Sequence, residues 1–166
     1  MKHCILATDL ALFFPNRAKL SQLQTDDMFD LSNVEHRLLL QTMVMTGSDL
    51  CASSKPWDQQ LKTVSVIYEE FYVQGDYERQ SGRLPVPIMN RYLEDEQALH
   101  QVTIWEYISI AITLCCQVGF LSGICIPCYS LLSSLLPSVT PMLDQCRDNL
   151  AVWRQLAETK KKEREL

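Results

Sequence analysis

The sequence predicts an all-α protein. Only 5 of the 166 residues are glycine, and no stretch shows the strict alternation of apolar and polar residues that marks a half-buried strand. Apolar residues instead recur at three- and four-residue spacing along most of the chain, which is typical of amphipathic helices. Hydrophobic residues make up 47% of the sequence, enough to fill a core, and the length is that of one domain.

Residues 1–57 are expected to contain two helices. An N-terminal helix should end at Pro15, since proline lacks the amide hydrogen that continues a helix. A second helix is predicted over 34–45, with the Asn33 side chain as its N-cap. Gly47 is expected to break that helix just before Asp49.

Longer helical segments are predicted after residue 57. A helix is predicted over 58–73 and should end or bend near Gly75. Residues 80–92 are rich in proline and glycine and are predicted to form a loop, and the last pattern, 118–160, should be jointed at two prolines. The two prolines at which the 118–160 segment should bend are Pro137 and Pro141. The apolar face of the 58–73 helix consists of Leu61, Val64, Ile67, Tyr68 and Phe71.

Charge and cysteine content exclude several classes of protein. The net charge of −5 gives no electrostatic reason to expect nucleic-acid binding. The seven cysteines are scattered through apolar stretches, which favours reduced thiols in a cytoplasmic protein over a disulfide framework. Cys125 and Cys128 have a C-x-x-C spacing, but no second pair with suitable spacing exists to complete a zinc site, so we expect both to pack in the core.

One long apolar stretch calls for a membrane test. The window 108–136 meets the length of about 20 apolar residues that a spanning helix needs. We nevertheless favour a soluble helical domain over a membrane span, because much of the stretch is explained by the insert described below. A small protein anchored in a membrane by residues 104–136 stays an alternative.

Ordered segments along the whole chain resemble a known family. Residues 5–12 read ILATDLAL, 45–50 MTGSDL, 55–57 KPW, 70–79 EFYVQGDYER, 87–91 PIMNR and 117–120 QVGF. In order and spacing they are similar to the catalytic domains of class I 3′,5′-cyclic-nucleotide phosphodiesterases. The segments 126–129 (IPCY) and 146–150 (CRDNL) look most like phosphodiesterase family ten, which acts on both cAMP and cGMP.

The resemblance implies a two-metal hydrolase. In this family zinc and magnesium share a bridging hydroxide and cleave cyclic nucleotide to the 5′-monophosphate. Asp49 matches one of the family's metal-binding aspartates. Thr8 matches a position near the metal-bound waters, where its hydroxyl would hold a water. The alternatives are that Asp49 is only a helix N-cap and that Thr8 bonds back to a backbone carbonyl.

The resemblance also assigns the purine-binding residues. Gln117 matches the glutamine whose amide reads the base edge, and Phe120 matches the aromatic ring that stacks on the base. Phe71 and Ile67 resemble the opposite apolar wall, and Gln60 resembles a neighbour that holds the reading glutamine in place. From periodicity alone, core packing is the alternative for Ile67, Phe71 and Phe120.

The chain departs from the family in what precedes residue 5. The family's H-N-x-x-H and H-D segments supply the general acid and three metal ligands, and they lie upstream of the ILATDLAL segment. The histidines of this chain are His3, His36 and His100, and none has that spacing. We therefore expect 1–166 to be a partial catalytic domain, the C-terminal half, and to be inactive as an isolated chain.

A second departure is an insert of sixteen residues at 102–117. Deleting it restores the family pattern with Gln101 in front of Val-Gly-Phe, so Gln101 and Gln117 compete for the base-reading role. The insert begins with Val and ends with Gln, whose codons can carry the GT and AG ends of an intron. We interpret it as a short in-frame intron that was translated.

The partners of the chain depend on which interpretation holds. A half-domain with an uncovered face would also suit a non-catalytic module that binds a helical partner. The resemblance is compatible with a homodimer of the longer protein, with cyclic nucleotide as its small-molecule partner.

Overall fold

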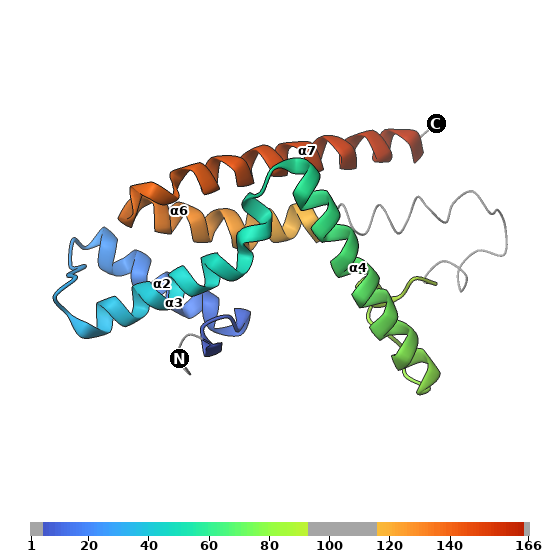
Figure 1. Ribbon diagram of the computed structural model, residues 1–166, viewed down its shortest axis with the longest axis horizontal. Coiled ribbons are helices and arrows are strands. Elements are labelled where there is room, and N and C mark those ends of the chain that lie inside the picture. Colours follow the sequence, from blue (N-terminus) through green and yellow to red (C-terminus); the bar gives the residue numbers. More distant parts are fainter. Residues whose placement is uncertain (1–4, 93–115, 165–166) are drawn as a thin grey trace. The chain divides into compact units, whose positions relative to one another are not determined.

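The computed structural model describes residues 5–92 and 116–164, and every regular element in these ranges is helical (Figure 1). The prediction of an all-α fold is thus confirmed. Gln101, His3, His100 and all of the insert except its last two residues lie outside the described residues. The long helices are α2 (Leu10–Thr25), α3 (Val34–Asp49), α4 (Trp57–Gln80), α6 (Ile126–Leu135) and α7 (Thr140–Arg164), with short turns η1 (Leu50–Ser54), η2 (Pro87–Met89), η3 (Leu121–Cys125) and η4 (Pro137–Val139).

The described residues form two compact units, which we treat separately. The first comprises 5–55 and 121–148, and the second comprises 56–92, 116–120 and 149–164. In the first unit α2, α3 and α6 pack on one another. Burying a large apolar side chain contributes about 1.5–3 kcal/mol, so the apolar seams between these helices are the main source of stability. The buried apolar residues there include Phe13, Leu20, Leu39, Met43, Leu121, Tyr129, Leu131, Leu132 and Leu143.

Helix α2 differs from its prediction at both ends. It begins after Asp9, whose side chain accepts a hydrogen bond from the Ala11 amide at 2.9 Å. It then continues through Pro15 to Thr25, so the predicted end at Pro15 is wrong. An interior proline costs about 3 kcal/mol. Burial of Phe13 and Leu20 on either side of Pro15 is large enough to offset that cost.

Helix α3 has the predicted start and a later end. The Asn33 side chain accepts from the Glu35 amide at 2.8 Å, which confirms the predicted N-cap. The predicted break at Gly47 is wrong, because the helix continues to Asp49. Gly47 serves helix packing instead: a Cβ there would lie 2.8 Å from Leu132 Cδ1 of α6. The missing side chain lets α6 approach α3 closely.

Helix α4 is likewise longer than predicted, and its buried face is rotated. It runs through Gly75 to Gln80, and its buried residues are Gln60, Val64, Tyr68 and Gly75. Leu61 and Ile67, predicted to face a core, are 45% and 39% exposed. The stripe steps by four residues from Gln60 to Tyr68 and by seven to Gly75, and Gln60 at its start is bonded by Trp153 of α7, as described below.

The cysteines and Pro137 of the C-terminal segments behave as predicted. Cys125 and Cys128 are buried and carry free thiols, so their C-x-x-C spacing is a core feature. Burial raises the pKa of Cys128 to about 12, which keeps this thiol neutral. The joint predicted at Pro137 also holds, because the chain leaves its helix at Leu136 and makes the η4 turn. Pro141 is not itself a joint, since it lies in the first turn of α7.

One helix in the described part of the chain is long and apolar enough to cross a membrane. This helix, Cys116–Leu135, includes the π-helical turn η3 and has a mean hydropathy of 1.6, and 28% of its apolar window is buried in the protein. Core helices of soluble proteins meet the same criteria of length and composition. Length and composition therefore do not decide between a core helix and a membrane span, and the membrane anchor stays an alternative.

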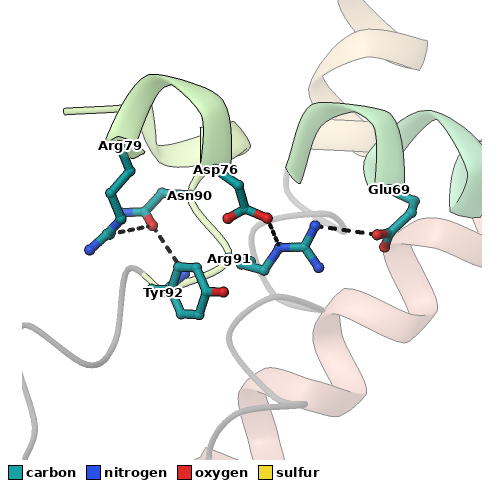
Figure 2. A network of polar contacts seen from close by, with 6 residues as sticks. All are labelled: Glu69, Asp76, Arg79, Asn90, Arg91 and Tyr92. Carbon is teal, nitrogen blue, oxygen red and sulfur yellow. Dashed lines mark hydrogen bonds and ion pairs between the residues drawn. The ribbon is translucent and has the colours of Figure 1, made fainter. Parts of the chain in front are cut away.

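Residues 81–92 turn back along the C-terminal half of α4, held by the polar network of Figure 2. Arg91 lies between two carboxylates of α4, with Nε 3.0 Å from Asp76 and Nη2 3.2 Å from Glu69. The Nε contact is an ion pair rather than an aligned hydrogen bond. Partly exposed pairs of this kind contribute at most about 1 kcal/mol each.

The second half of the network centres on Asn90. Its Oδ1 accepts from Arg79 Nη2 at 2.9 Å and from the Tyr92 amide at 3.0 Å. Its Nδ2 is buried and finds no hydrogen-bond partner among the described residues. Asn90 therefore meets two donors, Arg79 and the Tyr92 amide, through its Oδ1, while its own Nδ2 donor has no acceptor among the described residues.

We expect Gly75→Ala to detach the 81–92 segment from α4. A Cβ at Gly75 would lie 1.8 Å from the Met89 carbonyl oxygen, and a backbone atom cannot move aside as a side chain would. The loss of packing should lower the free energy of unfolding by about 1–3 kcal/mol, although alanine is the better helix former. Chemical denaturation measures this, with Gly123→Ala, where the added Cβ meets nothing within 4 Å, as the control. Equal stability of the two variants would contradict the packing role.

We expect Asn90→Asp to stabilise the protein at neutral pH by about 1 kcal/mol. A carboxylate replaces the unpartnered Nδ2 with an acceptor and turns the Arg79 contact into a charge-assisted one. Arg79 would hold the pKa of that carboxyl below its unfolded value. The gain should therefore be present at pH 7 and lost as the pH falls below about 4. Asn90→Ala is the control and should destabilise, and an Asn90→Asp variant less stable than the parent at pH 7 would refute this interpretation of the network.

Candidate functional site

The exposed carboxylate of Asp49 stands at the C-terminal end of α3. Asp49 is the last residue of that helix, and η1 begins at the next residue. Its side chain makes no capping hydrogen bond to η1, so the alternative that it serves as an N-cap does not hold. The carboxylate therefore has no role in closing the turn that follows it.

A buried hydrogen bond ties the segment before α2 to this end of α3. Thr46 Oγ1 lies 2.8 Å from the Ala7 carbonyl oxygen and donates to it, with the Thr42 carbonyl 3.1 Å away as a second acceptor. Ala7 is followed by Thr8, and Thr46 precedes Asp49 by three residues. The two positions that the family resemblance places near the metals thus belong to segments fastened to each other.

Thr8 lies in the turn before α2 rather than inside a helix. Its hydroxyl donates to the Ile5 carbonyl at 2.9 Å, which is the backbone bond that the sequence left as an alternative. The hydroxyl proton is therefore used, while the oxygen keeps its lone pairs as acceptors. A water held by Thr8 would have to donate to it, and this role stays a prediction.

The end of α3 is also held from the α6 side. The Tyr129 hydroxyl donates to the Gly47 carbonyl at 2.8 Å, and both residues are buried. Thr46 and Tyr129 were not among the residues that the sequence singled out for the site. The available signal was their position: Thr46 falls inside the MTGSDL segment, and Tyr129 recurs with buried residues at helical spacing.

The described residues do not contain a complete set of metal ligands. In 5–92 and 116–164 no group of three or more histidine, cysteine, aspartate or glutamate side chains lies close enough to hold a metal ion. Asp49 is thus a single carboxylate and not a complete ligand set. His36 is engaged elsewhere, since its Nδ1 accepts from the Asp30 amide at 3.1 Å and its ring stacks on Phe29. No reaction step through a metal follows from these residues alone.

Among the predicted purine-binding residues, Gln60 has the clearest partner. Its side chain is 2% exposed, and its Oε1 accepts from Trp153 Nε1 at 3.3 Å. Trp57 packs edge-on against Trp153, with ring centroids 4.9 Å apart. Trp153 therefore fixes the orientation of the Gln60 amide, and the Nε2 end remains a donor for a neighbouring group. Sequence reasoning missed Trp153 because the pairing joins residues 93 positions apart.

The two predicted walls of the purine slot lie on separate elements. Phe71 is half-buried and packs edge-on against Tyr68, with ring centroids 5.8 Å apart, and Ile67 is largely exposed. Gln117 and Phe120 are half-buried in the first turns of the Cys116–Leu135 helix. Among the described residues no hydrogen bond or ring contact joins these two pairs, so the slot that they would form stays a prediction.

Comparison with known proteins identifies the family. The sequence model of 3′5′-cyclic nucleotide phosphodiesterases matches residues 1–146. The relative named "Probable 3′,5′-cyclic phosphodiesterase pde-5" of Caenorhabditis elegans is 47% identical over 165 residues, which cover 99% of this chain and 20% of the relative. The cGMP-specific 3′,5′-cyclic phosphodiesterases of Drosophila melanogaster and Drosophila simulans are 35% identical over 159 residues, covering 95% of this chain.

The chain spans a fifth or less of the length of these curated relatives. The match nevertheless covers residues 1–146 of 166 and contains the segments around Thr8, Asp49 and Gln117. The resemblance predicted from those segments is confirmed: the chain belongs to the 3′5′-cyclic nucleotide phosphodiesterase family.

Proposed function

We propose that this chain is the C-terminal part of a catalytic domain that hydrolyses 3′,5′-cyclic nucleotide to the 5′-monophosphate. The observation that carries the proposal is the exposed Asp49 carboxylate at the end of α3, within a chain of this family, on a helix end held from two sides. Carboxylate oxygens suit both zinc and magnesium, so Asp49 is our candidate ligand for the metals. The remaining ligands and the general acid would come from outside the described residues.

Each candidate site residue would have a separate task in this reaction. The two metals would supply an activated water and stabilise charge at phosphorus. Asp49 would orient its carboxylate toward them, and Thr8 would accept from a water beside them. Gln117, or Gln101 in a chain without the insert, would bond the base edge, while Phe120 and Phe71 would bind its faces.

The substrate class proposed is a cyclic purine nucleotide, and cGMP is our first choice. Two of the relatives are named for cGMP specificity. The 126–129 and 146–150 segments favour family ten, which would add cAMP as a second substrate. A side-chain amide offers both a donor and an acceptor, so rotating it would suit either base. A cytoplasmic location fits this role and stays a prediction.

Asp49→Asn tests the metal role directly. We expect the chain joined to its upstream coding sequence to hydrolyse cGMP with zinc and magnesium, and the 166-residue chain alone to give no turnover. Removing one ligand charge should lower kcat/KM by roughly 10³-fold, since a metal supplies several kcal/mol of transition-state stabilisation. The control is Asp144→Asn, which removes an exposed ion pair to Arg147 on α7 and should keep full activity.

Either of two results would contradict the proposal. An Asp49→Asn variant as active as its Asp144→Asn control would remove Asp49 from the metal site. Turnover by the isolated chain above a metal-free control would contradict the need for upstream residues.

The insert is tested at the level of the transcript. If 102–117 is a translated intron, sequencing the messenger RNA across codons 100–119 should show His-Gln followed directly by Val-Gly-Phe. Gln101 would then be the base-reading residue. A message that contains all sixteen codons would make the insert part of the protein and leave Gln117 in that role.

A further inference from the structure

Tyr129 on α6 is hydrogen-bonded to the last turn of α3, although the two residues lie 82 positions apart in the sequence. Its side chain is 1% exposed, and its hydroxyl donates to the Gly47 carbonyl at 2.8 Å. Burial raises the pKa of Tyr129 to about 12, so the hydroxyl keeps its proton at neutral pH and stays a donor. The bond therefore persists throughout the neutral pH range.

The Gly47 carbonyl is one of those that a helix end leaves without a regular partner. The Leu50 amide, which follows the helix, donates to the carbonyls of Thr46 and Ser48. The carbonyl between them, that of Gly47, accepts from Tyr129. A side chain of another helix thus supplies a donor to the turn that ends in Asp49.

The same spot is also packed tightly. A Cβ on Gly47 would come within 2.8 Å of Leu132 Cδ1, 3.6 Å of Tyr129 Cε1 and 3.7 Å of Cys128 Sγ. The last turn of α3 therefore has little freedom to slide or rotate against α6. Because Asp49 is two residues further on, its backbone inherits this restraint while its side chain remains exposed.

We propose that Tyr129 is a positioning residue for the metal-binding carboxylate of Asp49 and acts through the Gly47 carbonyl. The inference rests on the proposed function, since it assigns Asp49 to the metals. Groups that orient a metal ligand are worth up to about 10–100-fold in metal affinity, and Tyr129 acts one step further away through the backbone. Losing its hydroxyl should loosen the α3 end, which weakens metal binding without touching the nucleotide.

Leu39 provides a matched control. It lies on α3, the helix that ends in Asp49, and is buried ten residues before Asp49. Leu39→Ala removes core volume from the same helix, more than two turns before the hydrogen bond at Gly47. It should lower stability without altering the ligand.

The experiment uses the protein that includes the upstream coding sequence, with Mn²⁺ alone as the metal probe. We expect Tyr129→Phe to weaken Mn²⁺ binding on the order of tenfold. Its kcat with cGMP should fall at subsaturating metal while KM for cGMP stays unchanged. Leu39→Ala should melt earlier than the parent yet bind Mn²⁺ with parental affinity.

The outcomes separate the two proposals. A parent protein that binds Mn²⁺ and hydrolyses cGMP, with Tyr129→Phe unchanged in Mn²⁺ affinity, overturns the positioning role alone. The positioning role also fails if Leu39→Ala weakens Mn²⁺ binding as much as Tyr129→Phe does, because the effect would then be general destabilisation. A parent protein that binds no Mn²⁺ overturns the proposed function and this inference with it.

Discussion

The close approach of α6 to the last turn of α3 at Gly47 is the contact on which the first compact unit depends. It requires a position without a side chain on α3, so that Leu132 and Tyr129 of α6 can pack directly on the backbone. Tyr129 then satisfies a carbonyl at that helix end, and Thr46, the residue before Gly47, donates to the Ala7 carbonyl. One seam between helices thereby fixes both the end of α3 and the segment that leads into α2.

This arrangement explains how the backbone at an exposed acidic residue can be held in place. Asp49 itself is neither buried nor used as a cap. Its backbone is held by the partners of Thr46 and Gly47, all of which are interior contacts. A ligand that is free to solvent on a restrained helix end suits metal binding, because little conformational freedom remains to be lost when the ion arrives.

Helical periodicity predicted the all-α fold, and the Asn33 cap and the proline joint at Pro137 followed from local chemistry. The errors concern Pro15, Gly47 and Gly75, which were all interpreted as helix breaks. Each lies inside a helix because a tertiary contact outweighs its local preference: burial around Pro15, and close approach of a neighbouring segment at the two glycines. The local sequence around these three residues does not indicate which distant segment will pack against them.

In the candidate site, too, local sequence identifies some residues, and contacts between distant segments determine the others. Asp49 and Thr8 could be selected because they lie in short segments shared with the family. Thr46, Tyr129 and Trp153 act through contacts 39, 82 and 93 residues away, so no local pattern marks them.

The position of the metal is the most direct test of the role given to Asp49. Crystals of the protein with its upstream coding sequence, grown with Zn²⁺, would locate the ion by anomalous scattering. We predict a zinc ion about 2.0–2.2 Å from an Asp49 carboxylate oxygen. A bound zinc ion with Asp49 outside its coordination sphere would contradict that role.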